Sequence, residues 1–103
     1  MSNQVLTMPK EKYYVYIITD AVRSAIYTGV TNDLRERMRK HREGTGEGFT
    51  DKRGASALVY YEVFDEPYSA ISREKALKAA SREDKMLLIQ TANQTWTDLF
   101  PNL

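Results

Sequence analysis

The chain contains no cysteine, so its 103 residues can form neither a disulfide framework nor a thiolate zinc site. It has a single histidine, which is too few for a multi-histidine metal centre. No run approaches about 18 apolar residues, and the first twelve residues, MSNQVLTMPKEK, hold no long apolar stretch. These absences exclude a membrane span and a signal peptide. We therefore expect a cytoplasmic protein in a reducing compartment, without a membrane partner.

Charge is nearly balanced, with 15 basic and 14 acidic residues, but it is unevenly distributed. Residues 35–42 hold five basic residues and one acidic residue. A local basic patch of this kind can bind phosphates even in a nearly neutral chain, although a solvated helix face gives the same pattern. The predicted nucleic-acid contacts are Arg35, Arg39, Lys40, Arg42, Lys52 and Arg53.

Hydrophobic alternation predicts three strands, over residues 13–19, 25–30 and 57–64. A turn over residues 20–24 makes the first two strands antiparallel. One face of the first strand carries Tyr14, Tyr16 and Ile18, and the other carries Tyr13, Val15 and Ile17. Tyr27 and Gly29 share a face of the second strand, so Tyr16 and Tyr27 can lie together.

Three helices are predicted. The first covers residues 34–42, follows an N-cap at Asn32 or Asp33 with Glu36 completing a weak capping box, and stops at Gly44. The glycines of EGTGEGF indicate a flexible loop, since no Gly-Lys-Ser/Thr follows them. A second helix covers residues 68–80 behind Pro67. A third follows a break at Ser81 or Arg82 and runs to about Thr91.

In this last helix we expect three side chains to face inward: Met86, Leu87 and Ile89. The segment NQTWTDLF carries the only tryptophan and is expected to dock on the core. The order ββαβαα predicts an α/β protein of the α+β type, with a small three-stranded antiparallel sheet flanked by helices. We expect one domain over residues 13–103, preceded by a flexible leader over residues 1–12.

Several polar residues could carry chemistry. Arg37 and His41 are spaced i,i+4, so they project from one helix face beside an anchoring stripe of Leu34 and Met38. A histidine there could transfer protons or contact phosphate, or it could be an ordinary surface residue. Glu74 could be a plain exposed glutamate, yet one carboxylate is enough for a hydrated Mg²⁺. Asn93 could equally be a helix C-cap or a loop residue.

Together these residues form an ordered pattern. Two half-motifs, Tyr14-Val15-Tyr16 and Tyr27-Thr28-Gly29, are followed by TNDLRERMRKH, SAISREKALK and NQTWTDLF. From residue 13 to residue 100 the chain resembles the GIY-YIG nuclease superfamily, particularly its small single-domain bacterial members, similar to the N-terminal domain of excinuclease C. Tyr14 and Val15 stand in place of the family's Gly and Ile, and Gln94 replaces a common proline.

The resemblance implies a set of catalytic residues: Tyr16, Tyr27, Arg37, His41, Glu74 and Asn93, with Gly29 as a structural motif residue. It implies that Glu74 binds the metal, Mg²⁺ or Mn²⁺, and that Arg37 holds the phosphate. Tyr16, Tyr27 and His41 remain rival general bases. A tyrosine with a pKa near 10 is a poor base at neutral pH unless the metal and Arg37 favour its phenolate form.

Two functions follow from this. The first is a metal-dependent DNA endonuclease in DNA repair or processing, structure-directed or weakly sequence-specific. Its substrate would be branched, single-stranded or damaged DNA, and the protein a monomer or weak homodimer. The alternative is a nucleic-acid-binding or partner-binding module on the same fold, with little or no turnover.

Overall fold

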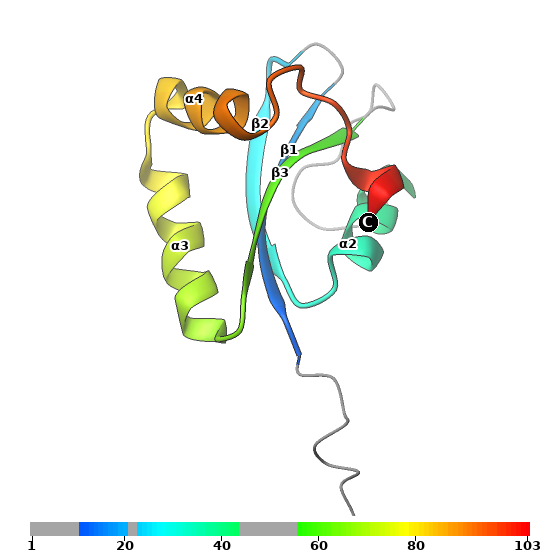
Figure 1. Cartoon of the computed structure of the whole chain (residues 1–103), viewed down its shortest axis with the longest axis vertical. Helices are drawn as coiled ribbons and strands as arrows, with labels where there is room; N and C mark the ends of the chain where they lie inside the picture. Colours follow the sequence, from blue (N-terminus) through cyan, green and yellow to red (C-terminus); the bar gives the residue numbers. More distant parts are fainter. Residues whose placement is uncertain (1–10, 21–22, 44–55) are drawn as a thin grey trace, which may run out of the picture.

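The computed structural model describes residues 11–20, 23–43 and 56–103. Its element order, with the labels of Figure 1, is β1 (Tyr13–Asp20), β2 (Ile26–Thr31), α2 (Leu34–Glu43), β3 (Ser56–Phe64), α3 (Pro67–Ala79), α4 (Arg82–Ala92) and the short 3₁₀ helix η1 (Phe100–Asn102). The three strands form one antiparallel sheet in the order β2-β1-β3. This confirms the predicted fold class, with element boundaries shifted by one residue at several ends.

Some predictions fall outside the described residues. These are most of the leader over residues 1–12, the glycine-rich loop after α2, and the nucleic-acid contacts at Lys52 and Arg53. Among the helices that the structure describes, none is long and apolar enough to cross a membrane.

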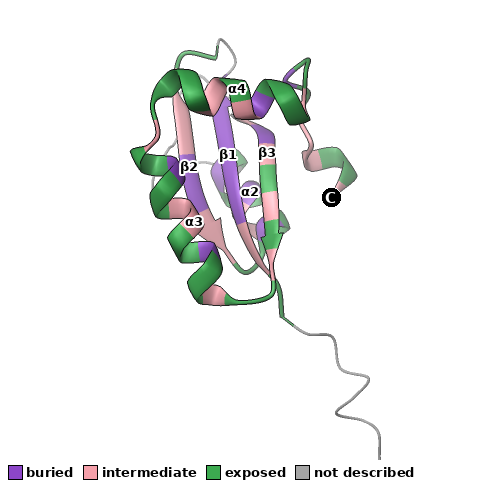
Figure 2. Cartoon of the chain, turned by 60° about the vertical axis from the view of Figure 1, so that its left-hand side comes forward, coloured by how far each residue is buried: buried purple, intermediate pink, exposed green. Residues whose placement is uncertain are grey.

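The helices cover both faces of the sheet (Figure 1). On one face, Leu34 and Met38 of α2 pack against Tyr16, Ile18 and Leu58, with η1 beside them. The other face is covered by α3 and α4. The central strand β1 is consequently buried along almost its whole length, as Figure 2 shows.

The start of α2 follows from its sequence, but one detail of the predicted cap is wrong. Asp33 is the N-cap, because its Oδ1 accepts a hydrogen bond from the backbone N–H of Glu36 at 3.1 Å. The predicted capping box does not form. The Glu36 carboxylate bonds Arg39, and the Asp33 N–H donates instead to Oγ1 of Thr31 at 3.1 Å.

An irregularity in β3 changes which of its side chains face α2. The register between β1 and β3 shifts between Ile17 and Ile18: Ile17 pairs with Tyr60, whereas Ile18 pairs with Leu58. The residue between them, Val59, forms a bulge and packs on the α4 side together with Tyr60. Tyr61 then lies on the α2 face, opposite Tyr16 in the register.

The segment after α4 crosses from one face of the sheet to the other. Trp96 is buried with Ile17 and Val59 on the α4 side, whereas Leu99 packs on the α2 side. Asp98 secures the crossing, since its Oδ1 accepts a hydrogen bond from the backbone N–H of Leu58 at 3.0 Å. The predicted docking of the tryptophan segment is confirmed.

The predicted inward face of α4 needs one correction. Ile89 is fully buried and Met86 is partly buried, but Leu87 is 63% exposed. Because successive residues of a helix are 100° apart, positions 86 and 89 lie on the same face of α4, whereas position 87 points away from it.

We expect Ile89→Ala to reduce the free energy of unfolding by about 2–5 kcal/mol through a core cavity. The matched variant Leu87→Ala should change it by less than about 0.5 kcal/mol.

Denaturant unfolding of the two variants, read by circular dichroism, measures both values. An equal loss for the two substitutions would contradict this orientation of α4.

Candidate functional site

The site is built around a close approach between Tyr16 and the backbone of Gly29. The two residues are direct partners in the β1–β2 register. A Cβ placed on Gly29 would lie only 2.5 Å from Cζ of Tyr16 and closer still to its hydroxyl. Position 29 therefore has no room for any side chain while Tyr16 keeps this orientation.

Three rings meet beside this contact. The Tyr16 hydroxyl lies 3.4 Å from Nε2 of His41. The Tyr27 ring centroid is 6.3 Å from that of Tyr16 and 5.8 Å from that of His41. Tyr16 and His41 are buried, with 1% and 3% of their surfaces exposed, whereas Tyr27 is half-buried. Of the three, Tyr27 is the group that water can reach most directly.

Two opposite charges act on the same hydroxyl group. Burial raises the pKa of Tyr16 well above its usual value, and the neighbouring Tyr27 raises it further. The Arg37 guanidinium lowers this pKa, and the Glu74 carboxylate raises it. Arg37 on α2 and Glu74 on α3 are therefore both close enough to Tyr16 for their charges to be felt there. The structure brings together the rings of Tyr16, Tyr27 and His41, and the charges of Arg37 and Glu74 both act on the pKa of Tyr16.

Asn93 has a different environment. It is the C-cap of α4, which confirms one of the two structural interpretations of this residue. Its side-chain amide donates to the carbonyl oxygens of Val59 at 3.0 Å and Thr97 at 2.8 Å, and its oxygen accepts from the Thr97 N–H. These bonds hold the turn in which Trp96 adopts a left-handed φ of 56°. Asn93 thus braces the turn before the crossing segment.

The predicted basic patch is partly neutralised within the protein. Arg39 forms an ion pair with Glu36, and Arg42 forms one with Asp98. Arg35 donates a hydrogen bond to the backbone carbonyl of Leu103. Lys40 is exposed and lines a cavity of about 190 Å³ with Arg37.

The chemistry of Glu74 fits a hydrated divalent cation. Its side chain is 13% exposed, and Nζ of Lys78 lies 2.7 Å from its Oε2. Within the described ranges, no group of three or more histidine, aspartate or glutamate side chains gathers to hold a metal. A single carboxylate is nevertheless a normal protein contribution for Mg²⁺, which keeps several waters and shares its shell with substrate phosphate.

Other carboxylates near the motifs in sequence are engaged elsewhere. Asp33 caps α2, and Glu62 accepts hydrogen bonds from the Arg73 guanidinium at 2.9–3.2 Å. Sequence reasoning missed Lys78 as a partner of Glu74. The i,i+4 spacing of a glutamate and a lysine within one predicted helix was the available signal.

We expect Gly29→Ala to lower the free energy of unfolding by about 1–3 kcal/mol, because the new Cβ meets the Tyr16 ring. The cost should shrink by at least about 1 kcal/mol when the same change is made in a Tyr16→Leu background. A double-mutant cycle from denaturant unfolding measures this coupling. Additive effects would show that the glycine serves something other than the tyrosine.

Comparisons with known proteins agree with this geometry. The model of the GIY-YIG catalytic domain matches residues 12–87. A UPF0213 protein of Clostridium perfringens is 41% identical over 78 residues, 76% of this chain and 83% of the relative. One of Haloquadratum walsbyi is 38% identical over 78 residues, 76% of this chain and 86% of the relative.

Among solved structures, the solution NMR structure of a UPF0213 protein from Bacillus halodurans is similar, with a TM-score of 0.52 and 34% identity. The match covers 78% of this chain and 84% of that one. The predicted resemblance is thereby confirmed, and family membership supports nuclease activity on DNA. The chain belongs to the GIY-YIG catalytic domain family.

Proposed function

We propose that this protein is a Mg²⁺- or Mn²⁺-dependent DNA endonuclease that hydrolyses phosphodiester bonds. The observation that carries the proposal is the cluster of Tyr16, Tyr27 and His41, whose buried phenol feels the charges of both Arg37 and Glu74. A cation, an acidic ligand and hydroxyl and imidazole groups are the parts that this hydrolysis needs. They come from two strands and two helices on a rigid sheet.

Arg37 and Glu74 have complementary tasks. The guanidinium binds two oxygens of the scissile phosphate as a bidentate fork and favours the charge that grows during attack. Glu74 holds the divalent metal, which when bound supplies charge neutralisation at the phosphate. The Lys78 ammonium, with Nζ 2.7 Å from Oε2 of Glu74, orients the carboxylate.

Proton transfer falls to His41 and Tyr27 rather than to Tyr16. Burial raises the pKa of Tyr16, so its phenol stays protonated at neutral pH and is a poor base; its hydroxyl lies 3.4 Å from Nε2 of His41, and either atom can be the donor. His41 is itself almost inaccessible to water. Tyr27 is half-buried and contacts the attacking water. The proton that leaves the water passes to the His41 nitrogen that does not bond Tyr16, while Nε2 of His41 carries its hydrogen toward the Tyr16 oxygen.

Cleavage is proposed to show little sequence preference, and residues 13–103 are proposed to form one nuclease domain that acts as a monomer or weak homodimer. Branched, single-stranded or damaged DNA is the proposed substrate, and DNA repair or processing the proposed context. Asn93 acts in this scheme by positioning the turn after α4. Lys40 is the best placed of the remaining basic residues for a further phosphate contact, since it shares a cavity with Arg37.

Glu74→Gln should reduce Mg²⁺-dependent cleavage by more than about 100-fold while the thermal unfolding profile is retained, because the isosteric amide loses the charge that holds the metal. Glu83→Gln, an exposed carboxylate on α4, is the matched control and should leave cleavage unchanged. Nicking of plasmid and labelled oligonucleotides with Mg²⁺, Mn²⁺ or a chelator measures this.

The same assay decides between the two functions. Wild-type protein that binds DNA but cuts none with either metal would be the binding module, and the endonuclease proposal would be wrong. Cleavage by Glu74→Gln at the wild-type rate would remove Glu74 from the metal site.

Arg37→Lys should lower the single-turnover cleavage rate by roughly 100-fold or more, the scale of losing one preorganised stabiliser. An ammonium keeps the charge but cannot grip two oxygens at once. The matched variant is Arg39→Lys on the same helix, whose side chain pairs with Glu36 and should be nearly silent. Near-wild-type cleavage by Arg37→Lys, or a larger loss from Arg39→Lys, would mean that another arginine binds the phosphate.

A further inference from the structure

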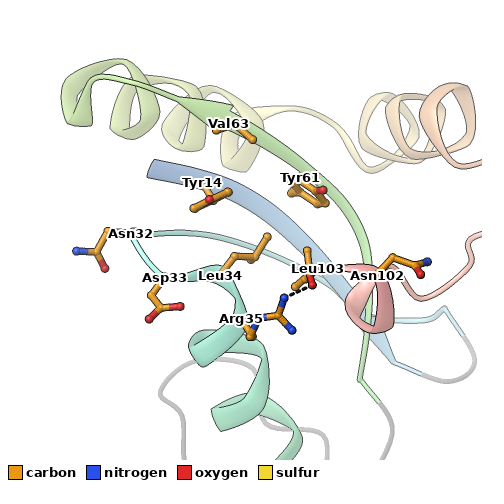
Figure 3. Close-up of a pocket in the computed structure, with 9 residues that line it drawn as sticks. All are labelled: Tyr14, Asn32, Asp33, Leu34, Arg35, Tyr61, Val63, Asn102 and Leu103. Carbon is orange, nitrogen blue, oxygen red and sulfur yellow. Dashed lines mark hydrogen bonds between the residues drawn. The ribbon is translucent and has the colours of Figure 1, made fainter. Parts of the chain in front are cut away.

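A cavity of about 430 Å³ lies on the α2 face of the sheet, beside the candidate site. It is enclosed by β1 and β3, the start of α2 and the segment around η1 (Figure 3). Its lining residues are Tyr14, Asn32, Asp33, Leu34, Arg35, Tyr61, Val63, Asn102 and Leu103. None of the roles proposed above uses this cavity.

One wall of the cavity is aromatic. Tyr14 and Tyr61 lie side by side on neighbouring strands, with ring centroids 6.3 Å apart and an interplanar angle of 64°. Tyr61 is 36% exposed, and the adjacent Val63 is 51% exposed. The bulge at Val59 puts Tyr61 on this face. The result is an accessible aromatic surface of the kind on which planar rings stack.

The rest of the lining is mixed, with the apolar side chains of Leu34, Val63 and Leu103 beside four polar residues. Arg35 and Asp33 contribute one charge of each sign, and Asn32 and Asn102 contribute amides. Asp33 and the balanced charge disfavour a phosphate as the occupant. Arginine, asparagine and aspartate side chains can read the hydrogen-bonding edges of bases. Within the protein Arg35 donates to the Leu103 carbonyl and Asn32 to Glu11, so an entering base would replace these bonds with bonds to its own edge. The cavity therefore suits a flat, uncharged ring with donors and acceptors on its edge.

The cavity adjoins the groove that holds Arg37. Asn32 and Asp33 line both the large cavity and the smaller one of about 190 Å³, whose wall includes Arg37 and Lys40. A strand whose phosphate lies at Arg37 can thus place a neighbouring base in the large cavity. The two cavities match the alternation of phosphate and base along a nucleic acid.

We propose that this cavity, named here the base pocket, binds one unstacked nucleobase of single-stranded DNA next to the phosphate held at Arg37. The inference rests on the proposed function, since it names the form of DNA that the same site takes. In a duplex, both faces of a base are stacked and its pairing edge is occupied. A base enters the pocket only where it is unpaired.

The test measures binding rather than cleavage. In a Glu74→Gln background, Tyr61→Leu should weaken binding of a labelled single-stranded oligonucleotide by about tenfold or more, while duplex binding is unaffected. Leucine keeps an apolar side chain at this strand edge and removes the ring. Tyr68→Leu is the matched control, because Tyr68 is 79% exposed on α3 and lies outside the pocket lining.

A second arm keeps the test independent of folding defects. Abasic sites are moved one position at a time along the oligonucleotide, and the affinity is measured for each. With the ring present, one position should weaken binding, and Tyr61→Leu should lose that sensitivity. Equal effects of Tyr61→Leu and Tyr68→Leu, no sensitive abasic position, or absence of single-strand binding would each overturn the proposal.

Failure of the proposed function gives a different result. If the protein without the Glu74 substitution binds single strands through the base pocket but cuts no DNA with Mg²⁺ or Mn²⁺, the endonuclease proposal fails and the base pocket stands. If it cuts DNA and Tyr61→Leu changes nothing, the reverse holds.

Discussion

The site depends on the contact between the Tyr16 ring and the bare backbone of Gly29. Because no Cβ stands on that residue, the phenol lies flat across β2 and its hydroxyl meets His41. His41 is buried on α2, whose Leu34 and Met38 pack in the core with Tyr16. Arg37, one turn before His41 on the same helix, lowers the pKa of this hydroxyl group. The absence of a side chain at position 29 of β2 thus lets Tyr16 of β1 meet His41 of α2.

The proposed site also includes a residue from a helix on the opposite face of the sheet. Figure 2 shows α3 beside β2, and its Glu74 acts electrostatically on Tyr16 although α2 and α3 cover different faces. The three-stranded sheet makes this possible, because β2 is an edge strand with only β1 as its neighbour. Groups from both faces can meet around that edge. The base pocket lies toward the other edge, where the bulge in β3 turns Tyr61 to the α2 face.

Regular alternation of apolar and polar residues, together with helix-capping residues, explains which structural features could be predicted from the sequence. The faces of β1, the N-cap at Asp33 and the burial of Met38 all follow from local rules. The bulge at Val59 could not be predicted in this way. One extra residue in a strand cannot be recognised within a continuous apolar run such as ALVYYEVF. The number of charged residues in a segment also does not show which arginines form ion pairs, since Arg42 pairs with Asp98, which is 56 residues away in the sequence. The residues proposed for the site come from the family resemblance and remain a prediction, whereas their separation into buried and water-accessible groups required the packed structure.

We propose that Arg37 and the Glu74 carboxylate hold one phosphate and one metal beside Tyr16. A crystal structure of the protein with Mn²⁺ and a short non-hydrolysable oligonucleotide tests this arrangement, because the anomalous scattering of manganese identifies the position of the ion. We expect one manganese ion coordinated by Glu74, and one backbone phosphate that contacts both that ion and the Arg37 guanidinium. A manganese ion held by other carboxylates, such as Asp33 or Asp98, or a phosphate bound away from Arg37, would contradict it.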